Sequence, residues 1–301
     1  MPALSDVLTA LDTLWPPERA EDWDAVGTVC GDPSDHVDRV LIAVDPVQEI
    51  ADEAVELGAQ LLLTHHPLYL RGTTTVAADT FKGRVVHTLI RNGIALQVAH
   101  TNADRADPGV SDALAGALGL RITGPLVPDP DDPAGRRGLG RICELDQPLT
   151  VAEFAAYAAA RLPATAQGVR AAGDPDRPVR TVAVCGGSGD SLFPAVRAAG
   201  VDAYLTADLR HHPASEAREQ SPLALVDAAH WATEWPWCEQ AATQLDALSD
   251  RHGWDLRVHV SHRVTDPWSA HAAADPARPS STTPHRGAAR APSEVTPGAP
   301  N

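Results

Sequence analysis

A short apolar run that begins at Leu61 stops at two adjacent histidines, His65 and His66. An apolar run without polar alternation is typical of a strand that is covered on both faces. Such strands occur in sheets flanked by helices, so this run constrains the fold more than any other segment. In open α/β sheets, ligands bind beyond the carboxyl ends of the strands, which is where both imidazoles fall.

Further apolar segments alternate with amphipathic helices along the body of the chain. This alternation predicts an α/β protein with largely parallel or mixed sheets covered by helices. Three of the other predicted strands also end at polar side chains. They are 94–99, which leads to His100 and Asp104, 203–206, which leads to Asp208, and 223–229, which leads to His230 and Glu234. Because each half of the chain carries two such strands, we predict a site between two domains.

Composition sets the predicted domain boundaries. A stretch rich in Pro, Asp and Gly predicts a linker between the domains. The predicted ranges are 1–124 for domain one, completed by about 235–268, then 125–138 for the linker, and 139–234 for domain two. From Ser269 onward the chain has Val295 as its only large aliphatic residue. Such a segment buries little apolar surface, so 269–301 is predicted to be a disordered tail.

Charge and hydropathy exclude several classes of partner. The formal net charge of −16 argues against a nucleic-acid groove, because phosphate binding needs clustered basic residues. No apolar run approaches the roughly 18 residues that a membrane span needs, and the N-terminus lacks a signal-peptide pattern, so a cytoplasmic location is predicted. The four cysteines are scattered without a CxxC pair, which argues against a disulfide framework and against a thiolate zinc site.

The side chains at the strand ends have the chemistry of metal ligands. Imidazole and carboxylate groups bind Zn, Mn, Fe, Co or Ni. His230 and Glu234 stand four residues apart, so they share one face if a helix begins there. Adjacent histidines diverge on a strand, but at its end they can serve two neighbouring ions. Each motif alone also fits an exposed or capping role, and their recurrence at several strand ends favours a metal site.

Two other motifs are less specific. The pair His211-His212 either lines the cavity of the predicted site or lies exposed at the start of a helix, and the second interpretation is favoured. The glycine-rich segment 184–191 lies between a predicted strand and a predicted helix, where backbone amides can bind phosphate. Leu192 replaces the third glycine of a dinucleotide-binding fingerprint, so we interpret the segment as a tight turn.

Together these residues resemble the GTP cyclohydrolase 1 type 2 homologs, also called Nif-three-like dinuclear-metal-centre proteins. The resemblance covers about residues 1–268. It rests on Trp23-Asp24 with Gly27 and Gly31, Thr64-His65-His66-Pro67, His100-Thr101-Asn102-Ala103-Asp104, Val184-Cys185-Gly186-Gly187-Ser188-Gly189, Tyr204-Leu205-Thr206-Ala207-Asp208, and Asp227-Ala228-Ala229-His230 with Glu234.

The resemblance implies a two-domain α/β subunit with mixed sheets flanked by helices and with ligands at the carboxyl ends of strands. It implies two divalent ions per chain, bridged or nearly bridged by the glutamate, and a ring-shaped homohexamer. The family's ligand positions fall on His65, His66, Asp104, His230 and Glu234. The short linker implies that the extra domain of some members is missing here.

The activity implied by the family name is that of a metal-dependent hydrolase. A metal hydroxide attacks C8 of the guanine of GTP, the imidazole ring opens and formate leaves. His100, beside the cluster, is the candidate catalytic residue that orients a ligand or shuttles protons. The expected partner is a small-molecule substrate, a nucleotide if the family name applies.

Two alternatives stay open. One is a phosphate-ester hydrolase that uses the same ions, and the other is a non-catalytic metal-binding scaffold or regulator. Arg71, Arg105 and Arg210 lie next to the motifs and could hold phosphates, which a scaffold would not need.

Overall fold

The computed structural model describes residues 1–273, whose strands form two mixed sheets. The strands are β1 (Gly27–Cys30), β2 (Arg39–Ala43), β3 (Leu61–Thr64), β4 (Ala95–Val98), β5 (Arg121–Pro128), β6 (Gly138–Thr150), β7 (Val169–Ala172), β8 (Pro178–Ser188), β9 (Ala203–Ala207), β10 (Ala224–Ala228) and β11 (Arg257–Val260). The helices are α1 (Leu4–Leu14), α2 (Gln48–Leu57), α3 (Phe81–Arg91), α4 (Thr101–Asp104), α5 (Val110–Ala117), α6 (Val151–Ala159), α7 (Phe193–Ala199), α8 (His211–Gln220) and α9 (His230–His252), with short 3-10 helices η1 (Pro17–Arg19) and η2 (Asp190–Leu192).

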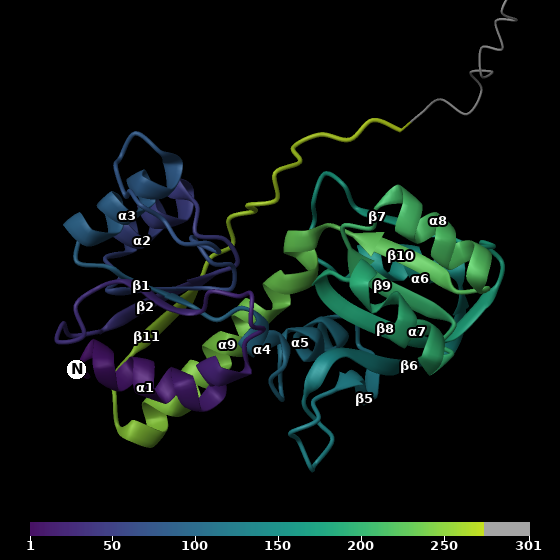
Figure 1. Cartoon of the computed structure of the whole chain (residues 1–301), viewed down its shortest axis with the longest axis horizontal. Coiled ribbons are helices and arrows are strands. Elements are labelled where there is room, and N and C mark those ends of the chain that lie inside the picture. The colour runs from purple at the N-terminus through teal and green to yellow at the C-terminus, as the bar shows by residue number, and fades with distance from the viewer. Residues whose placement is uncertain (274–301) are drawn as a thin grey trace, which may run out of the picture. The chain divides into compact units, whose positions relative to one another are not determined.

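The first sheet has the strand order β1-β4-β3-β2-β11, and only its edge strand β1 pairs antiparallel. Helices cover both of its faces (Figure 1). Leu41 and Leu62 belong to one buried cluster with α2 and α3, whereas Ile42 and Leu63 belong to another with α1 and α9. Because successive side chains on a strand point to opposite faces, burial on both sides requires the apolar runs seen in the sequence.

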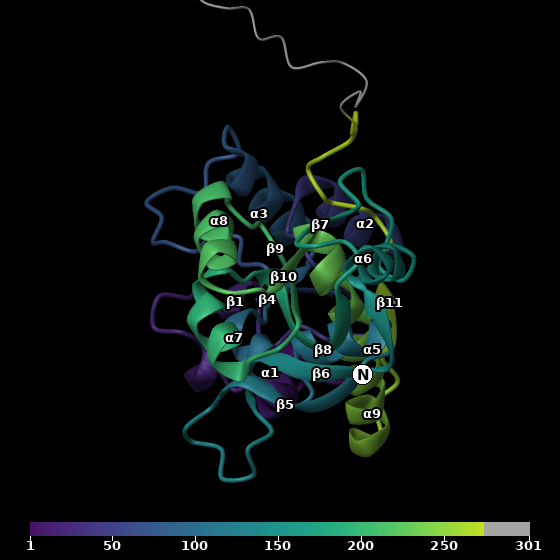
Figure 2. The same ribbon diagram turned by 90° about the vertical axis from the view of Figure 1, so that its right-hand side faces the viewer.

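The second sheet has the order β5-β6-β8-β9-β10-β7, in which β8, β9 and β10 are parallel. Its two faces are also covered, by α7 and α8 on one side and by α5, α6 and α9 on the other (Figures 1 and 2). Helix α9 contacts β2 and β11 of the first sheet and β8 and β9 of the second. One buried cluster therefore extends through both sheets, and the predicted α/β architecture with two mixed sheets flanked by helices is confirmed.

The prediction of a linker at 125–138 is wrong, because the stretch belongs to a β-hairpin. Its first residues lie in β5, which pairs antiparallel with β6 across the intervening loop. Pro125 and Pro128 lie in β5, an edge strand, which is where prolines of a sheet are usually found. Helix α5 precedes the predicted boundary at 124 but packs on β6 and β8. The division into two domains otherwise stays a prediction.

The predicted tail, 269–301, falls mainly outside the described residues, which end at 273. Within it, Ser269–Ala273 are exposed and have no regular secondary structure. Among the helices of residues 1–273, none combines the length and the apolar character needed to cross a membrane.

A buried ion pair joins the second sheet to α5. Arg141 on β6 is 1% exposed, and its Nε and Nη2 donate to the carboxylate of Asp112. Its Nη1 donates to the carbonyl oxygens of Gly138 and Gly140, 2.7 and 2.8 Å away. Asp112 also accepts from the amide of Gly109 and so fixes the start of α5. The pair connects the β5–β6 hairpin to the helix beneath it.

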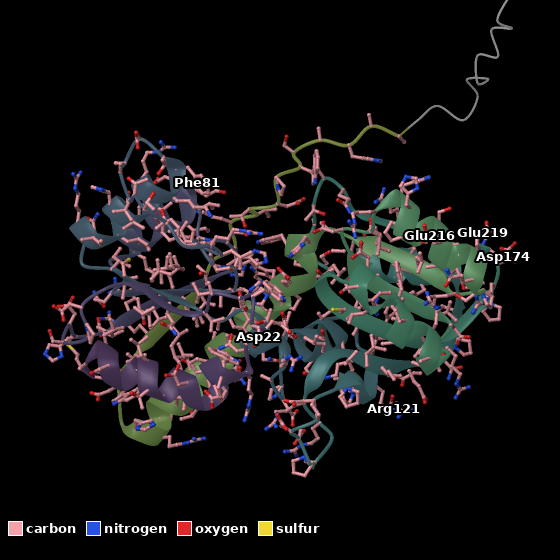
Figure 3. All side chains as sticks on the ribbon, in the orientation of Figure 1. Asp22, Phe81, Arg121, Asp174, Glu216 and Glu219 are labelled. Atoms are coloured by element: carbon pink, nitrogen blue, oxygen red, sulfur yellow. The ribbon has the colours of Figure 1, made fainter. Side chains whose placement is uncertain are left out.

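We expect Arg141→Met to lower the free energy of unfolding by about 3–5 kcal/mol, because it leaves the Asp112 carboxylate without its partner. Arg121→Met is the matched control, since Arg121 is exposed on β5 (Figure 3) and, among residues 1–273, forms its one ion pair with Glu144. Its loss should cost less than about 1 kcal/mol. Urea denaturation of both variants measures the two values, and equal losses would contradict a structural role for Arg141.

Candidate metal centre

The carboxyl ends of strands from both sheets deliver side chains to one pocket. His65 and His66 directly follow β3, and His100 follows β4 as the residue before α4. His230 is the first residue of α9, one residue beyond Ala229, which follows β10, and Glu234 lies one turn later on the same helix. The condition stated for the shared face is therefore met, because the helix begins at His230 and places His230 and Glu234 on one face.

Glu234 is the residue on which the imidazoles converge. Its side chain is 4% exposed, and its Oε1 lies 3.0 Å from Nε2 of His230 and 3.6 Å from Nε2 of His65. Its Oε2 lies 2.9 Å from Nε2 of His66. The Nε2 atoms of His66 and His230 are only 3.2 Å apart. A buried carboxylate must be compensated by positive charge, so this arrangement needs protons or cations among the nitrogens.

The other ring nitrogen, Nδ1, is held by an oxygen atom in each of four histidines. The pairs are His65 with the carbonyl of Ala99 at 2.9 Å, His66 with Asp45 at 2.7 Å, His100 with Asp24 at 2.8 Å, and His230 with Asp208 at 2.7 Å. An acceptor at Nδ1 keeps the hydrogen on that atom and leaves the lone pair of a neutral imidazole on Nε2. Metal-binding histidines are oriented in this way.

The charges of the cluster also alter its protonation. Burial disfavours the charged form of His66, but Glu234 and Asp45 together raise the pKa of His66 to about 10. The charge of Glu234 raises the pKa of His230 to about 11. Burial opposes the charge of Glu234, yet the nearby imidazoles hold the pKa of Glu234 well below its usual range. The cluster therefore attracts positive charge.

Two groups of three side chains could each hold a metal ion, because their ligand atoms lie within 4.8 Å of one another. The groups are His65 with His66 and His100, and His66 with His230 and Glu234. His66 belongs to both, so the groups adjoin. Asp104, a predicted ligand, lies beside the first group, with Oδ1 3.7 Å from Nε2 of His65. His100, which we predicted as a catalytic residue, lies within that group.

The glycine-rich segment forms a wall of this pocket. Gly187 has a φ of +68°, and a Cβ atom there would lie 2.3 Å from Oε1 of Glu234 and 3.1 Å from Nε2 of His230. Only glycine lets β8 approach the cluster this closely. The segment thus leaves space for the carboxylate and the imidazole of α9.

The pocket has a volume of about 380 Å³ and contains Trp23 in its lining. Trp23 is 58% exposed, and its ring centre lies 6.0 Å from that of His100. None of the described residues that line the pocket is a lysine or an arginine. Arg105 instead donates to Glu21, and Arg210 donates to Asp190.

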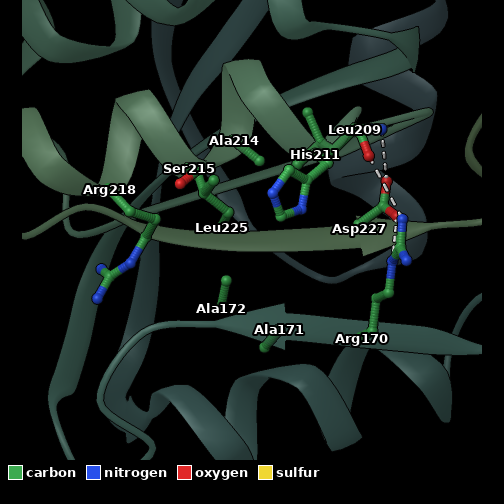
Figure 4. Close-up of a pocket in the computed structure, with 10 residues that line it drawn as sticks. All are labelled: Arg170, Ala171, Ala172, Leu209, His211, Ala214, Ser215, Arg218, Leu225 and Asp227. Atoms are coloured by element: carbon green, nitrogen blue, oxygen red, sulfur yellow. Dashed lines mark hydrogen bonds and ion pairs between the residues drawn. The ribbon is translucent and has the colours of Figure 1, made fainter. Parts of the chain in front are cut away.

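His211 and His212 lie apart from the cluster. Both are exposed at the start of α8, which confirms the favoured interpretation. His211 points into a separate cavity of about 370 Å³ beside Arg170 and Asp227 (Figure 4). These two histidines are therefore absent from both candidate ligand groups.

The sequence analysis missed the carboxylates that hold the histidines. Asp24 and Asp208 stand in the motifs, but nothing assigned them an imidazole partner. Asp45 was not identified at all, although it comes two residues after β2. The rule that located the histidines, polar groups at the ends of buried strands, also applies to Asp45.

Comparisons with known proteins agree with this fold. A GTP cyclohydrolase 1 type 2 homolog of Streptomyces coelicolor is 78% identical, over 92% of this chain and 97% of the relative. The protein of the same name from Mycobacterium tuberculosis is 40% identical, over 88% of this chain and 96% of the relative. The crystal structure of a Bacillus cereus protein related to NIF3 matches with a TM-score of 0.83 and 26% identity, covering 89% of this chain and 98% of that one. The model of the Duf34/NIF3 (NGG1p interacting factor 3) family matches residues 2–267, and the chain belongs to this family.

Proposed function

We propose that the protein is a hydrolase that depends on two divalent metal ions and opens the imidazole ring of the guanine of GTP, with release of formate. The observation that carries the metal dependence is the buried carboxylate of Glu234, on which three imidazoles converge through Nε2. The name of the Streptomyces coelicolor relative, GTP cyclohydrolase 1 type 2 homolog, supports the substrate.

The side chains fit such ions. Oε2 of Glu234 is buried and accepts no hydrogen bond from the described residues, although Nε2 of His66 lies 2.9 Å away. At this distance a proton or a metal cation must lie between or beside the two atoms. Cys185 also lines the pocket, but it belongs to neither group of candidate ligands. Nitrogen and oxygen donors suit Zn, Mn, Fe, Co or Ni.

We assign the ligands by their positions around the carboxylate. Glu234 would serve both ions, because its two oxygens face different imidazoles. The proposed ligands are His65, His66, Asp104, His230 and Glu234. When bound, the two ions would lower the pKa of a water molecule and stabilise negative charge on the substrate.

His100 is the proposed proton carrier. Asp24 accepts from its Nδ1, so Nε2 is the atom that can take up or release a proton in the pocket. Release of C8 as formate consumes two water molecules and breaks both bonds from C8 to nitrogen. A proton must reach each nitrogen that leaves, and the proposed donor is His100, whose imidazole lies in one group with His65 and His66.

The lining of the pocket favours recognition of a flat ring over recognition of phosphate. Trp23 offers an exposed aromatic face, on which a heteroaromatic base can stack. Arg105 and Arg210, two candidate phosphate ligands, are engaged by acidic side chains. These features favour ring opening over the rival phosphate-ester hydrolysis.

We expect the purified protein to carry close to two divalent ions per chain, and Glu234→Ala to lose most of both, because one carboxylate serves both ions. His212→Ala is the control, since His212 is an exposed histidine outside the cluster. Elemental analysis of the two variants gives the metal content. Equal retention of metal in both would contradict the assignment of Glu234.

Trp23→Ala should raise the KM for GTP by about tenfold or more, because stacking of one base on an aromatic ring contributes about 1–3 kcal/mol. Trp23→Phe should keep most of the affinity. Phe81→Ala is the control, because Phe81 is 53% exposed on α3, outside the pocket (Figure 3). The measurement is the rate of formate release at several GTP concentrations, and an unchanged KM in Trp23→Ala would exclude the stacking role.

The same assay separates the rival functions when formate and inorganic phosphate are measured together with manganese- or zinc-loaded protein. Formate without phosphate supports ring opening. Phosphate alone supports a phosphate-ester hydrolase on the same ions. Neither product, with the metal cluster intact, favours a non-catalytic scaffold or regulator.

A further inference from the structure

The chain segment that follows β11 runs toward the metal centre. Strand β11 is parallel to β2, with Val260 opposite Ile42, and the amide of Ser261 donates to the carbonyl of Ile42 at 2.8 Å. Both chain segments therefore leave the sheet at the same edge. Residues 261–268, drawn in yellow in Figure 1, pass beside the residues that follow β2, among them Asp45.

The start of this segment is fixed to two helices. The Ser261 carbonyl accepts from Nε1 of Trp235 on α9 at 2.8 Å, and its hydroxyl donates to Glu53 on α2 at 2.6 Å. Arg263 pairs with Glu53 and with Glu56. These contacts determine where the next residues of the segment lie.

Thr265 contacts the carboxylate that orients a candidate ligand. Its hydroxyl donates to Oδ2 of Asp45, while Oδ1 of Asp45 accepts from Nδ1 of His66 at 2.7 Å. Among the described residues, no other side chain hydrogen-bonds to Oδ2 of Asp45. The threonine thus leaves one carboxylate oxygen directed at the histidine and restrains rotation of the carboxylate.

The same arrangement occurs a second time in the cluster. Oδ1 of Asp24 accepts from Nδ1 of His100, and Oδ2 accepts from the hydroxyl of Thr101. Thr101 is adjacent to its histidine in sequence, whereas Thr265 comes from a segment about 200 residues after His66. Two histidines of the cluster are therefore held by an aspartate whose second oxygen is bound by a threonine.

We propose that Thr265 is a positioning residue of the metal centre, and that it acts through Asp45 on the orientation of the His66 imidazole. The proposal rests on the proposed function, because it takes His66 to be a metal ligand. The segment also contributes to a cavity beside the cluster: Thr265 and Asp266 line a cavity of about 240 Å³ together with His66 and His230. The proposal implies that the metal site needs the chain to extend at least to Thr265 and no farther than Trp268.

The first test compares variants of the full chain for zinc affinity. Zinc-loaded protein is equilibrated with a competing chelator, and the dissociation constant is obtained from the partition of the metal. Thr265→Val removes the hydroxyl at nearly constant volume. We expect the affinity for zinc to fall about three- to tenfold, which is less than the fall typical when a residue that hydrogen-bonds directly to a metal ligand is replaced. Thr265→Ser should restore affinity to within about twofold. Thr243→Val is the control, because Thr243 donates to a carbonyl within α9 on the exposed surface.

A double-mutant cycle tests whether Thr265 acts through Asp45. Asp45→Ala should weaken zinc binding more than Thr265→Val does. Adding Thr265→Val to Asp45→Ala should then cause no further loss. Independent, multiplicative effects would overturn the proposal that Thr265 acts on His66 through this carboxylate.

Two truncations locate the end of the required segment. A chain that ends at Trp268 should retain the zinc affinity of the full chain, whereas one that ends at Val264 should lose at least as much as Thr265→Val. An unchanged dissociation constant in Thr265→Val would overturn the role of Thr265 but leave the proposed function intact. A full chain that binds no zinc, manganese, iron, cobalt or nickel would overturn the proposed function, and the role of Thr265 with it.

Discussion

The contact between the Glu234 carboxylate and three imidazoles is the interaction on which the arrangement of the site depends. The carboxylate is nearly inaccessible to water, so its charge must be balanced within the protein. His65 and His66 come from the end of β3 in the first sheet, whereas His230 and Glu234 follow β10 in the second. The charge balance is therefore made across the two sheets, and it is possible only if their carboxyl ends meet.

Helix α9 makes that meeting possible. Its first two turns carry His230 and Glu234, and the following turns enter the buried cluster shared by both sheets. Trp237 is fully buried there, and its ring centre lies 5.2 Å from those of both Trp15 and His65. The aromatic contact fixes one face of the His65 ring, while the carbonyl of Ala99 fixes its Nδ1. Apolar packing and hydrogen bonding thus restrict the same imidazole.

The sequence allowed the α/β fold and the cluster to be predicted because both depend on local patterns. Apolar runs locate buried strands, and His65, His66 and His230 stand where those strands end. Asp45 stands near a strand end, but its role and that of Thr265 depend on contacts between segments far apart in sequence, which no local pattern reveals. The hairpin at 121–150 was missed because prolines in an edge strand resemble those of a linker.

The most direct measurement of the central claim is anomalous X-ray diffraction from crystals of the full chain grown with zinc or manganese. We expect two anomalous peaks per chain, on either side of the Glu234 carboxylate, each within about 2.0–2.2 Å of ligating nitrogen or oxygen atoms when zinc is bound. Nε2 of His65, His66 and His230 should face the peaks, with every Nδ1 still bound to its oxygen acceptor. Peaks remote from Glu234, or none at all in this pocket, would contradict the claim that the cluster is a dinuclear metal centre.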